Sequence, residues 1–304
     1  MRFPFRAMAA EHEILVDHDD GDLARRAAES AIADVQRIEA KYSRYRDDSV
    51  TSAIARAAGG APVAIDAETA ALLDYADTCF TLSGGAFDIT SGVLRRAWDF
   101  RGQPPRLPTA AEVEALLPLV GWPRVERTAT TLRLPSPGMQ LDFGGIGKEY
   151  AADRAAGVLA THGIAHALVN LGGDLRAIGP QRDGRPWRIG IRPPRPVPGG
   201  LPAIAQVDLA DAALATSGDY ERFIEVDGVR YSHLLDARTG WPVRHWRSMS
   251  VVAPLAVVAG SFATLAMLQG PQAPGFLDGH GVAWLGIDGD GALRGTLERK
   301  APGG

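Results

Sequence analysis

The segment LAVVAGSFATLAMLQ, residues 255–269, combines a helical composition with almost no polar face. A helix that is apolar on every side has to be covered by other elements over most of its surface. The segment is too short to cross a bilayer, which takes about 20 apolar residues. The chain must therefore pack its other elements around this helix, and its 304 residues, 46% of them hydrophobic, suffice for a sizeable core.

Other periodic segments predict a mixture of strands and helices. HEILVDH, residues 12–18, is the first strand candidate, and apolar residues spaced by three and four predict a helix from about Leu23. A second helical pattern covers residues 66–85 and ends on a glycine pair. MSVVAP, residues 249–254, predicts a buried strand.

The C-terminal segment GVAWLGIDGDGALRGTLE, residues 281–298, has Asp-Gly turns between alternating runs, which is typical of a hairpin. Thr109 and Glu112 have the spacing of a capping box and predict the start of a short helix. Antiparallel hairpin signals outnumber βαβ repeats, so we expect the α+β class. No internal repeat or convincing linker divides the chain, which predicts one domain over residues 1–304.

Charge and termini limit the partners and the location. A net charge of −4 provides no broad basic surface, so we expect no nucleic-acid partner. Residues 1–20 lack the apolar run of a signal peptide, and no segment reaches the length of a membrane span. These features predict a cytoplasmic location. The single cysteine, Cys79, lies in an apolar helical pattern and is expected to be a buried core residue.

A glycine turn, LDFGGIGKEYAAD at residues 141–153, invites comparison with two phosphate-binding motifs. A P-loop needs glycine where Asp142 stands and Ser or Thr where Glu149 stands, so that motif is excluded. A dinucleotide fingerprint starting at Gly145 needs a third glycine where Tyr150 stands. The turn therefore belongs to neither class.

Several polar residues are weak signals when each is taken singly. His233 lies in the apolar strand context YSHLLDARTG, where a lone histidine is more often structural than catalytic. Thr216 and Ser217 look like part of a turn, with Gly218 supplying a positive φ. Asp142 could bind a ligand or simply fix the glycine turn through its side chain.

The order of these segments is more informative than any one of them. Their succession resembles the ApbE-type flavin transferases, and the match runs colinearly from Met8 to about Gly270. SHLLDARTGWP and LDFGGIGKEYAAD are the most specific blocks. The matching segments, in chain order, are SRYRDDSVTSAI, SGGAFDITSGVLRRAWDF, LDFGGIGKEYAAD, LVNLGGDLRAIG, ATSGDYER, YSHLLDARTGWPV and SMSVVAPLAVVAGSFATLAMLQG.

This resemblance implies a fold and a reaction. The fold would be a T-fold-related, ApbE-like α+β domain with FAD between two lobes. Members bind FAD and, with Mg²⁺, transfer FMN onto a Thr or Ser hydroxyl of a target flavoprotein, releasing AMP. Attack by an alcohol on a diphosphate needs a base for the hydroxyl proton and a cation for the phosphate charge.

The resemblance also assigns roles to individual residues. His233 would deprotonate the acceptor hydroxyl, in a turn shaped by Asp236 and Thr239. The backbone carbonyl of Gly145 and the hydroxyl of Thr264 would bind the metal. The positions implied to contact FAD are Met8, Tyr45, Ala86, Phe87, Asp88, Asp142, Lys148 and His233.

Two positions depart from the family pattern. Ala55 stands where the family has Asn in its first loop, and Gly260 stands where it has a metal-binding Asp. Residues four apart share a helix face, so an acid at 260 would reach the same ion as Thr264. Ser261 lies about 100° around the helix and is a poor substitute. The matched metal site thus lacks the carboxylate that Mg²⁺ usually keeps.

Three hypotheses follow from Gly260. The chain is an active transferase whose metal is held by FAD phosphates, Thr264 and carbonyls, with or without an acid from elsewhere. Alternatively, it is an FAD-binding protein with weakened or lost activity, or a Mg²⁺-dependent hydrolase that converts FAD to FMN and AMP. The survival of His233, Lys148 and Asp142 favours the first hypothesis.

Overall fold

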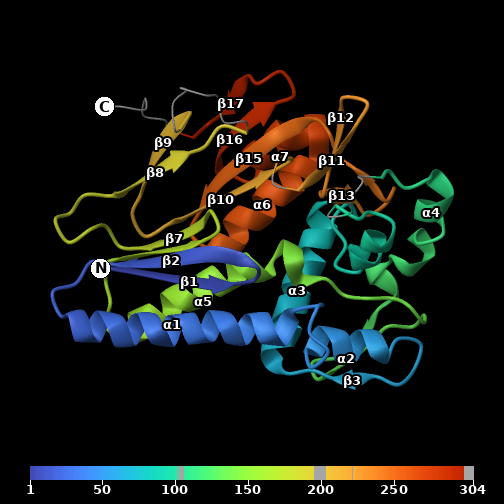
Figure 1. Cartoon of the computed structure of the whole chain (residues 1–304), viewed down its shortest axis with the longest axis horizontal. Helices are drawn as coiled ribbons and strands as arrows, with labels where there is room; N and C mark the ends of the chain where they lie inside the picture. The colour runs from blue at the N-terminus through green and yellow to red at the C-terminus, as the bar shows by residue number, and fades with distance from the viewer. Residues whose placement is uncertain (101, 103–105, 195–202, 221, 298–304) are drawn as a thin grey trace.

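A large antiparallel sheet organises the molecule (Figure 1). The computed structural model describes residues 1–100, 102, 106–194, 203–220 and 222–297. Every pairing in this sheet is antiparallel, which together with its helices confirms the predicted α+β class. In spatial order its strands are β1 (Arg2–Ala7), β2 (Ala10–Val16), β6 (Ala167–Leu171), β7 (Asp174–Ile178), β10 (Ala213–Gly218), β15 (Trp246–Ala253), β16 (Ala283–Asp288) and β17 (Leu293–Gly295).

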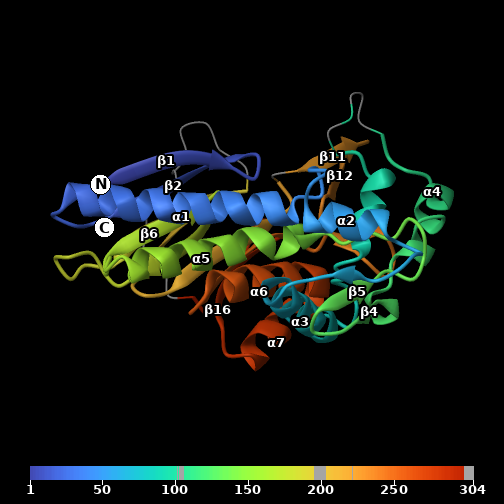
Figure 2. The same ribbon diagram turned by 90° about the horizontal axis from the view of Figure 1, so that it is seen from below.

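Three helices lie side by side over one face of this sheet: α1 (Gly21–Tyr42), α5 (Gly147–Thr161) and α6 (Ala256–Gln269) (Figure 2). Helix α1 begins at an Asp20 N-cap, whose side chain accepts hydrogen bonds from the backbone N–H groups of Asp22 and Leu23. Its apolar face, predicted from the spacing, packs in the core between helices and sheet through Ala27, Ala31, Val35, Ile38 and Tyr42.

The apolar segment at residues 255–269 forms α6, and its burial confirms the expectation from its composition. It contacts α5, the strands β10 and β15, and α7 (Ala273–Gly279). Gly260 and most of its neighbours on this helix are buried. No helix in the described part of the chain is both long and apolar enough to cross a membrane.

The opposite face of the sheet carries a hairpin of β8 (Trp187–Ile191) and β9 (Ala205–Leu209). Trp187, Val207 and Leu209 pack there against Leu168 and Leu214 of the sheet. The large sheet is therefore covered by helices on one face and by this hairpin on the other.

The remaining elements gather beyond one end of the sheet (Figure 1). Cys79 is buried in this region, as predicted, and Thr109 with Glu112 forms the predicted capping box. The helices are α2 (Val50–Arg56), α3 (Ala67–Leu82) and α4 (Ala110–Glu114), with the short helices η1 (Ser91–Arg96), η2 (Leu117–Leu119), η3 (Trp122–Arg124) and η4 (Phe143–Gly145); η5 (Gly270–Gln272) follows α6. The strands are β3 (Val63–Ala64), β4 (Glu126–Arg127), β5 (Thr131–Arg133), β11 (Phe223–Val226), β12 (Val229–Ser232), β13 (Leu235–Asp236) and β14 (Trp241–Pro242).

The expected turn at Thr216 and Ser217 is wrong. Both residues belong to β10, where they pair with Ser250 and Met249 of β15, and Gly218 does not have a positive φ. Pairing with β15 holds this segment extended, and that pairing overrides the local turn composition.

Candidate functional site

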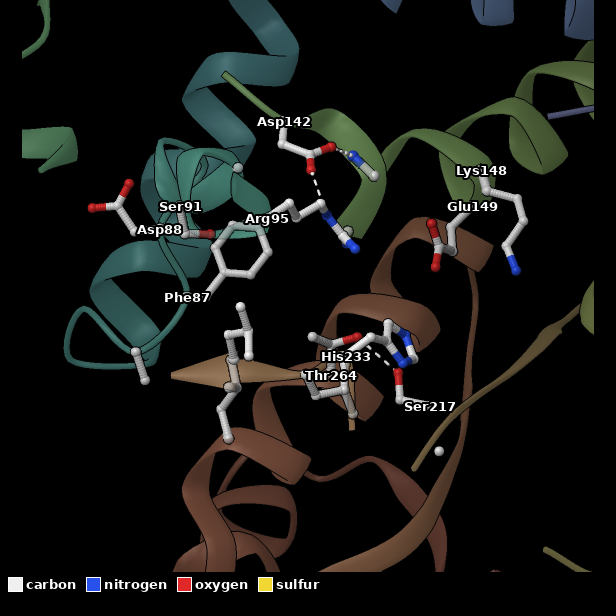
Figure 3. A pocket seen from close by; sticks show the side chains of 18 of the residues that line it. Phe87, Asp88, Ser91, Arg95, Asp142, Lys148, Glu149, Ser217, His233 and Thr264 are labelled. Carbon is white, nitrogen blue, oxygen red and sulfur yellow. Dashed lines mark hydrogen bonds and ion pairs between the residues drawn. The ribbon is translucent and has the colours of Figure 1, made fainter. Parts of the chain in front are cut away.

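A pocket lies where the elements beyond the sheet meet α5, α6 and β10 (Figure 3). Six segments that are far apart in the sequence supply its lining, including the glycine turn and the SHLLD segment. The lining residues are Ala86, Phe87, Asp88, Ser91, Gly92, Arg95, Asp142, Gly144, Gly145, Lys148, Glu149, Asp174, Thr216, Ser217, Gly218, His233, Leu234, Leu235, Thr264 and Leu268.

Asp142 fixes the glycine turn. Its carboxylate accepts a hydrogen bond from the backbone N–H of Gly144 at 2.9 Å and caps η4. The same carboxylate pairs with Arg44 at 2.8 Å and with Arg95 at 3.4 Å. Burial acts to raise the pKa of Asp142, but the charges of Arg95 and Arg44 outweigh it and lower the pKa below its ordinary value. Asp142 is therefore ionised, and it connects the glycine turn to Arg95 of the pocket wall and to Arg44.

Gly145 has to be glycine because an aromatic ring packs against its backbone. A Cβ at this position would lie 2.9 Å from Cε2 of Phe87. The sequence separates these two residues by almost sixty positions, yet the structure places both in the pocket wall. The close approach leaves the backbone of Gly145 uncovered by a side chain of its own.

Asp88 holds the neighbouring loop together. Its buried carboxylate accepts hydrogen bonds from the backbone N–H of Thr90 at 2.7 Å and of Trp122 at 2.8 Å. The carbonyl of Ala86 accepts a hydrogen bond from Ala237 at 2.9 Å, which ties this loop to the SHLLDARTG segment. The loop is thus positioned by contacts on both of its sides.

His233 lines the pocket and is held in one orientation. Its Nδ1 lies 3.2 Å from the backbone carbonyl oxygen of Arg222. A carbonyl can only accept, so Nδ1 carries the proton and Nε2 keeps its lone pair. Burial and then the charge of Arg95 lower the pKa of His233 to about 4. The imidazole is therefore neutral near pH 7 and able to accept a proton.

Two hydroxyls meet below the histidine in Figure 3. Oγ of Ser217 on β10 and Oγ1 of Thr264 on α6 lie 2.7 Å apart. Both line the pocket, so this pair presents oxygen donors at the contact between sheet and helix.

Glu149 is a pocket residue that sequence reasoning missed as a site residue. It lies in the first turn of α5, is 8% exposed, and its Oε2 has no hydrogen-bond partner among the residues that the structure describes. Burial and then the charge of Asp174 raise the pKa of Glu149 above its ordinary value. Asp174, also buried, pairs with Lys148 at 2.8 Å.

Gly260 lies against this same glutamate. A Cβ at position 260 would be 2.9 Å from Oε1 and 3.0 Å from Cδ of Glu149, with Cγ closer still. The Glu149 side chain thus fills the volume that a side chain at position 260 would need. The sequence signal for this contact lies only in the two positions taken together, because Gly260 alone indicates a missing acid and Glu149 alone does not stand out.

The pocket brings together most of the residues that the sequence singled out. Two predicted FAD contacts, Met8 and Tyr45, do not line it. The backbone N–H of Met8, in the β1–β2 turn, donates to Oε1 of Glu39 at 2.6 Å. Tyr45 is 75% exposed, and the guanidinium of Arg44 lies over its ring. Arg44 also pairs with Asp142. Sequence reasoning did not single out Arg44, Arg95 or Asp174.

The donor set suits a hard cation. The described residues contain no group of three or more His, Cys, Asp or Glu side chains arranged to hold a metal ion. Mg²⁺, however, also accepts carbonyl and hydroxyl oxygens and ligand phosphates. Gly145, Thr264 and Glu149 line one pocket, and one carboxylate oxygen of Glu149 has no hydrogen-bond partner among the described residues, so the residues present fit such an ion.

Comparisons with known proteins agree with this picture. The chain is 35% identical over 260 residues to an FAD:protein FMN transferase of Treponema pallidum, covering 80% of this chain and 71% of the relative. A Salmonella typhimurium protein of the same name is 32% identical, with 82% and 73% covered.

Solved structures extend the likeness to the fold. The ApbE protein of Thermotoga maritima superposes with a TM-score of 0.87 at 32% identity, covering 97% of this chain and 96% of that one. The Pseudomonas stutzeri flavinyl transferase ApbE, in its apo form, gives 0.86 at 28% identity, covering 97% and 94%. The sequence model of the ApbE family matches residues 8–284, and the chain therefore belongs to the ApbE family.

Proposed function

We propose that the chain is an FAD:protein FMN transferase, which moves FMN from FAD onto a Thr or Ser hydroxyl of a target flavoprotein and releases AMP. The observation that carries this proposal is the meeting of His233, the glycine turn and Thr264 in one pocket. Relatives that bear this name match most of the chain at 32–35% identity.

The pocket wall would hold the dinucleotide. Phe87 offers an aromatic face, and the backbone of Gly145 is open beside it. Lys148 brings a cation to the same pocket, where it suits a diphosphate. Ala86, Asp88 and Asp142 position these groups, and contacts of Met8 and Tyr45 with FAD stay predictions.

His233 would act as the general base. The acceptor hydroxyl gives its proton to Nε2 as its oxygen forms a bond to the phosphorus of the FMN half. The bond between that phosphorus and the bridging oxygen breaks, and AMP leaves with the bridging oxygen. A neutral imidazole is required for this step, and the lowered pKa of His233 provides it near pH 7.

Mg²⁺ would supply charge neutralisation at the phosphate oxygens when it is bound. The backbone carbonyl of Gly145 and the hydroxyl of Thr264 are the proposed protein ligands, with the phosphates of FAD completing the set. Ser217 would orient the Thr264 hydroxyl through their 2.7 Å contact.

The transfer is tested by incubating purified protein with FAD, Mg²⁺ and a flavoprotein domain that carries an acceptor Thr. We expect a covalently fluorescent acceptor on a denaturing gel and AMP in equal amount. AMP without labelled acceptor would instead establish FAD hydrolysis. Bound FAD with neither product would establish an inactive FAD-binding protein.

The location of the protein stays a prediction. We keep a cytoplasmic location as a proposal, and cell fractionation with an antibody to the protein tests it.

A further inference from the structure

The structure raises a question about charge in the proposed cation site. Thr264 and Gly260 are four residues apart on α6 and therefore share one face of that helix. Thr264 can offer only a neutral oxygen, and Gly260 offers no side chain. Mg²⁺ usually keeps at least one carboxylate in addition to phosphate oxygens, so an acid has to come from another element.

Glu149 is placed to supply that acid. Its side chain reaches from the first turn of α5 to the surface of α6 at Gly260, where a Cβ would come within 2.9 Å of Oε1. The volume is occupied by the carboxylate end of Glu149 rather than by a side chain of α6. This contact also explains why the chain has glycine at this position inside a helix, where glycine is less favourable than alanine.

The surroundings of Glu149 leave one of its two carboxylate oxygens without a hydrogen-bond partner in the described part of the chain. The residue is 8% exposed, and this oxygen is Oε2. The second acid, Asp174, is also buried and pairs with Lys148 at 2.8 Å. Two acids and one lysine leave an excess of negative charge, and burying an uncompensated carboxylate costs several kcal/mol. A bound cation removes that cost.

We propose that Glu149 is a ligand of the divalent cation in this pocket, so that α5 delivers the carboxylate that α6 lacks at Gly260. This inference rests on the proposed function for the presence of the cation.

The test measures binding of Mn²⁺, as a paramagnetic substitute for Mg²⁺, to the FAD-saturated protein by electron paramagnetic resonance. We expect Glu149→Gln, which keeps the volume and removes the charge, to weaken Mn²⁺ binding at least tenfold. Glu225→Gln, an equal charge change at an exposed position on β11, is the matched control and should leave Mn²⁺ binding unchanged. Wild-type affinity in Glu149→Gln would overturn the proposal, as would a wild-type protein that binds FAD but no Mn²⁺.

A pair of variants moves the acid between the helices and keeps the test valid if Glu149→Gln folds poorly. Gly260→Asp alone places two side chains in one volume and should weaken Mn²⁺ binding or stability. Adding Glu149→Ala vacates that volume, and we expect the double variant Glu149→Ala/Gly260→Asp to bind Mn²⁺ at least tenfold more tightly than Glu149→Ala. No gain in the double variant would contradict a shared carboxylate position.

The same samples separate this inference from the proposed function. If wild-type protein binds FAD and Mn²⁺ but labels no acceptor, the transferase proposal fails while the role of Glu149 can still be read from the metal affinities. If acceptor is labelled and Glu149→Gln binds Mn²⁺ normally, the inference fails alone.

Discussion

Glu149 and Gly260 lie on different helices, but the side chain of Glu149 and any side chain at position 260 would need the same space. The Glu149 side chain fills the space that a Cβ at position 260 would enter, so the residue allowed at each position depends on the other. Read singly, Gly260 indicates a lost metal ligand. Read with Glu149, it makes room for an acid from α5, which supports the hypothesis of an active enzyme over that of a weakened one.

Substituting Gly260 by alanine should have opposite effects in two backgrounds. In the wild-type chain the added methyl displaces Glu149, and we expect a loss of about 1–3 kcal/mol in the free energy of unfolding. In a Glu149→Ala background the space is open, and the same change should stabilise the helix by about 0.5–1 kcal/mol. Urea unfolding of the four proteins measures both values.

The matched control for this cycle is Gly157→Ala, because a Cβ at that position of α5 would meet nothing within 4 Å. Its effect should be the same in both backgrounds. Equal effects of Gly260→Ala with and without Glu149 would contradict the shared volume.

At the scale of elements, Glu68 of α3 connects this helix to α1 and to α5, and α5 contributes residues to the pocket wall. From the first turn of α3 its carboxylate accepts hydrogen bonds from Arg37 of α1 at 2.8 Å and from the Tyr150 hydroxyl of α5 at 2.9 Å. Lys41 of α1 adds an ion pair at 2.6 Å. The hydrogen bond from Arg37 is the main cause that lowers the pKa of Glu68 well below its ordinary value.

Glu68→Gln should lower the free energy of unfolding at pH 7 by about 1–2 kcal/mol, because charge-assisted hydrogen bonds at a partly buried site are lost. The folded-state pKa of Glu68 is depressed, so its contribution is complete above its unfolded pKa of about 4.3 and declines as the pH falls below that value. Urea unfolding at pH 7 and pH 3 should show a smaller difference from wild type at pH 3. A difference that grows on acidification would contradict this role, and Glu114→Gln, at an exposed position on α4, is the control.

The elements that could be predicted are those whose signal lies in their own sequence. The spacing of Ala27, Ala31 and Val35 predicts α1, the apolar composition of residues 255–269 predicts α6, and the Asp-Gly turns predict the hairpin of β16 and β17. The local composition at Thr216 and Ser217 predicts a turn, although both residues belong to strand β10. Its extended form comes from pairing with β7 and β15, which no local pattern contains.

At the scale of the whole molecule, the pocket exists only because distant segments meet. His233, Gly145 and Thr264 could be assigned because specific motifs resemble one family, and the structure places all three in one pocket. Glu149 could not be assigned in this way, because its role depends on the distance between α5 and α6. Arg44 and Arg95 were missed for the same reason, since only the fold brings them to Asp142.

The predicted single domain over residues 1–304 stays a prediction, but the packing is consistent with it. Helix α6 contacts the sheet through β10 and β15 and contacts α3, an element beyond the sheet. The hydroxyl of Tyr75 on α3 donates to the carbonyl of Val257 on α6 at 3.0 Å.

The most direct test of the account is the mass of an acceptor flavoprotein domain after incubation with the protein, FAD and Mg²⁺. We predict that wild-type protein adds the mass of one FMN moiety to a single Thr or Ser. His233→Ala should slow that addition about 10²- to 10⁴-fold even when FAD saturates the protein, because the proton acceptor is lost. An acceptor whose mass does not change with wild-type protein, or is changed equally fast by His233→Ala, would contradict the account.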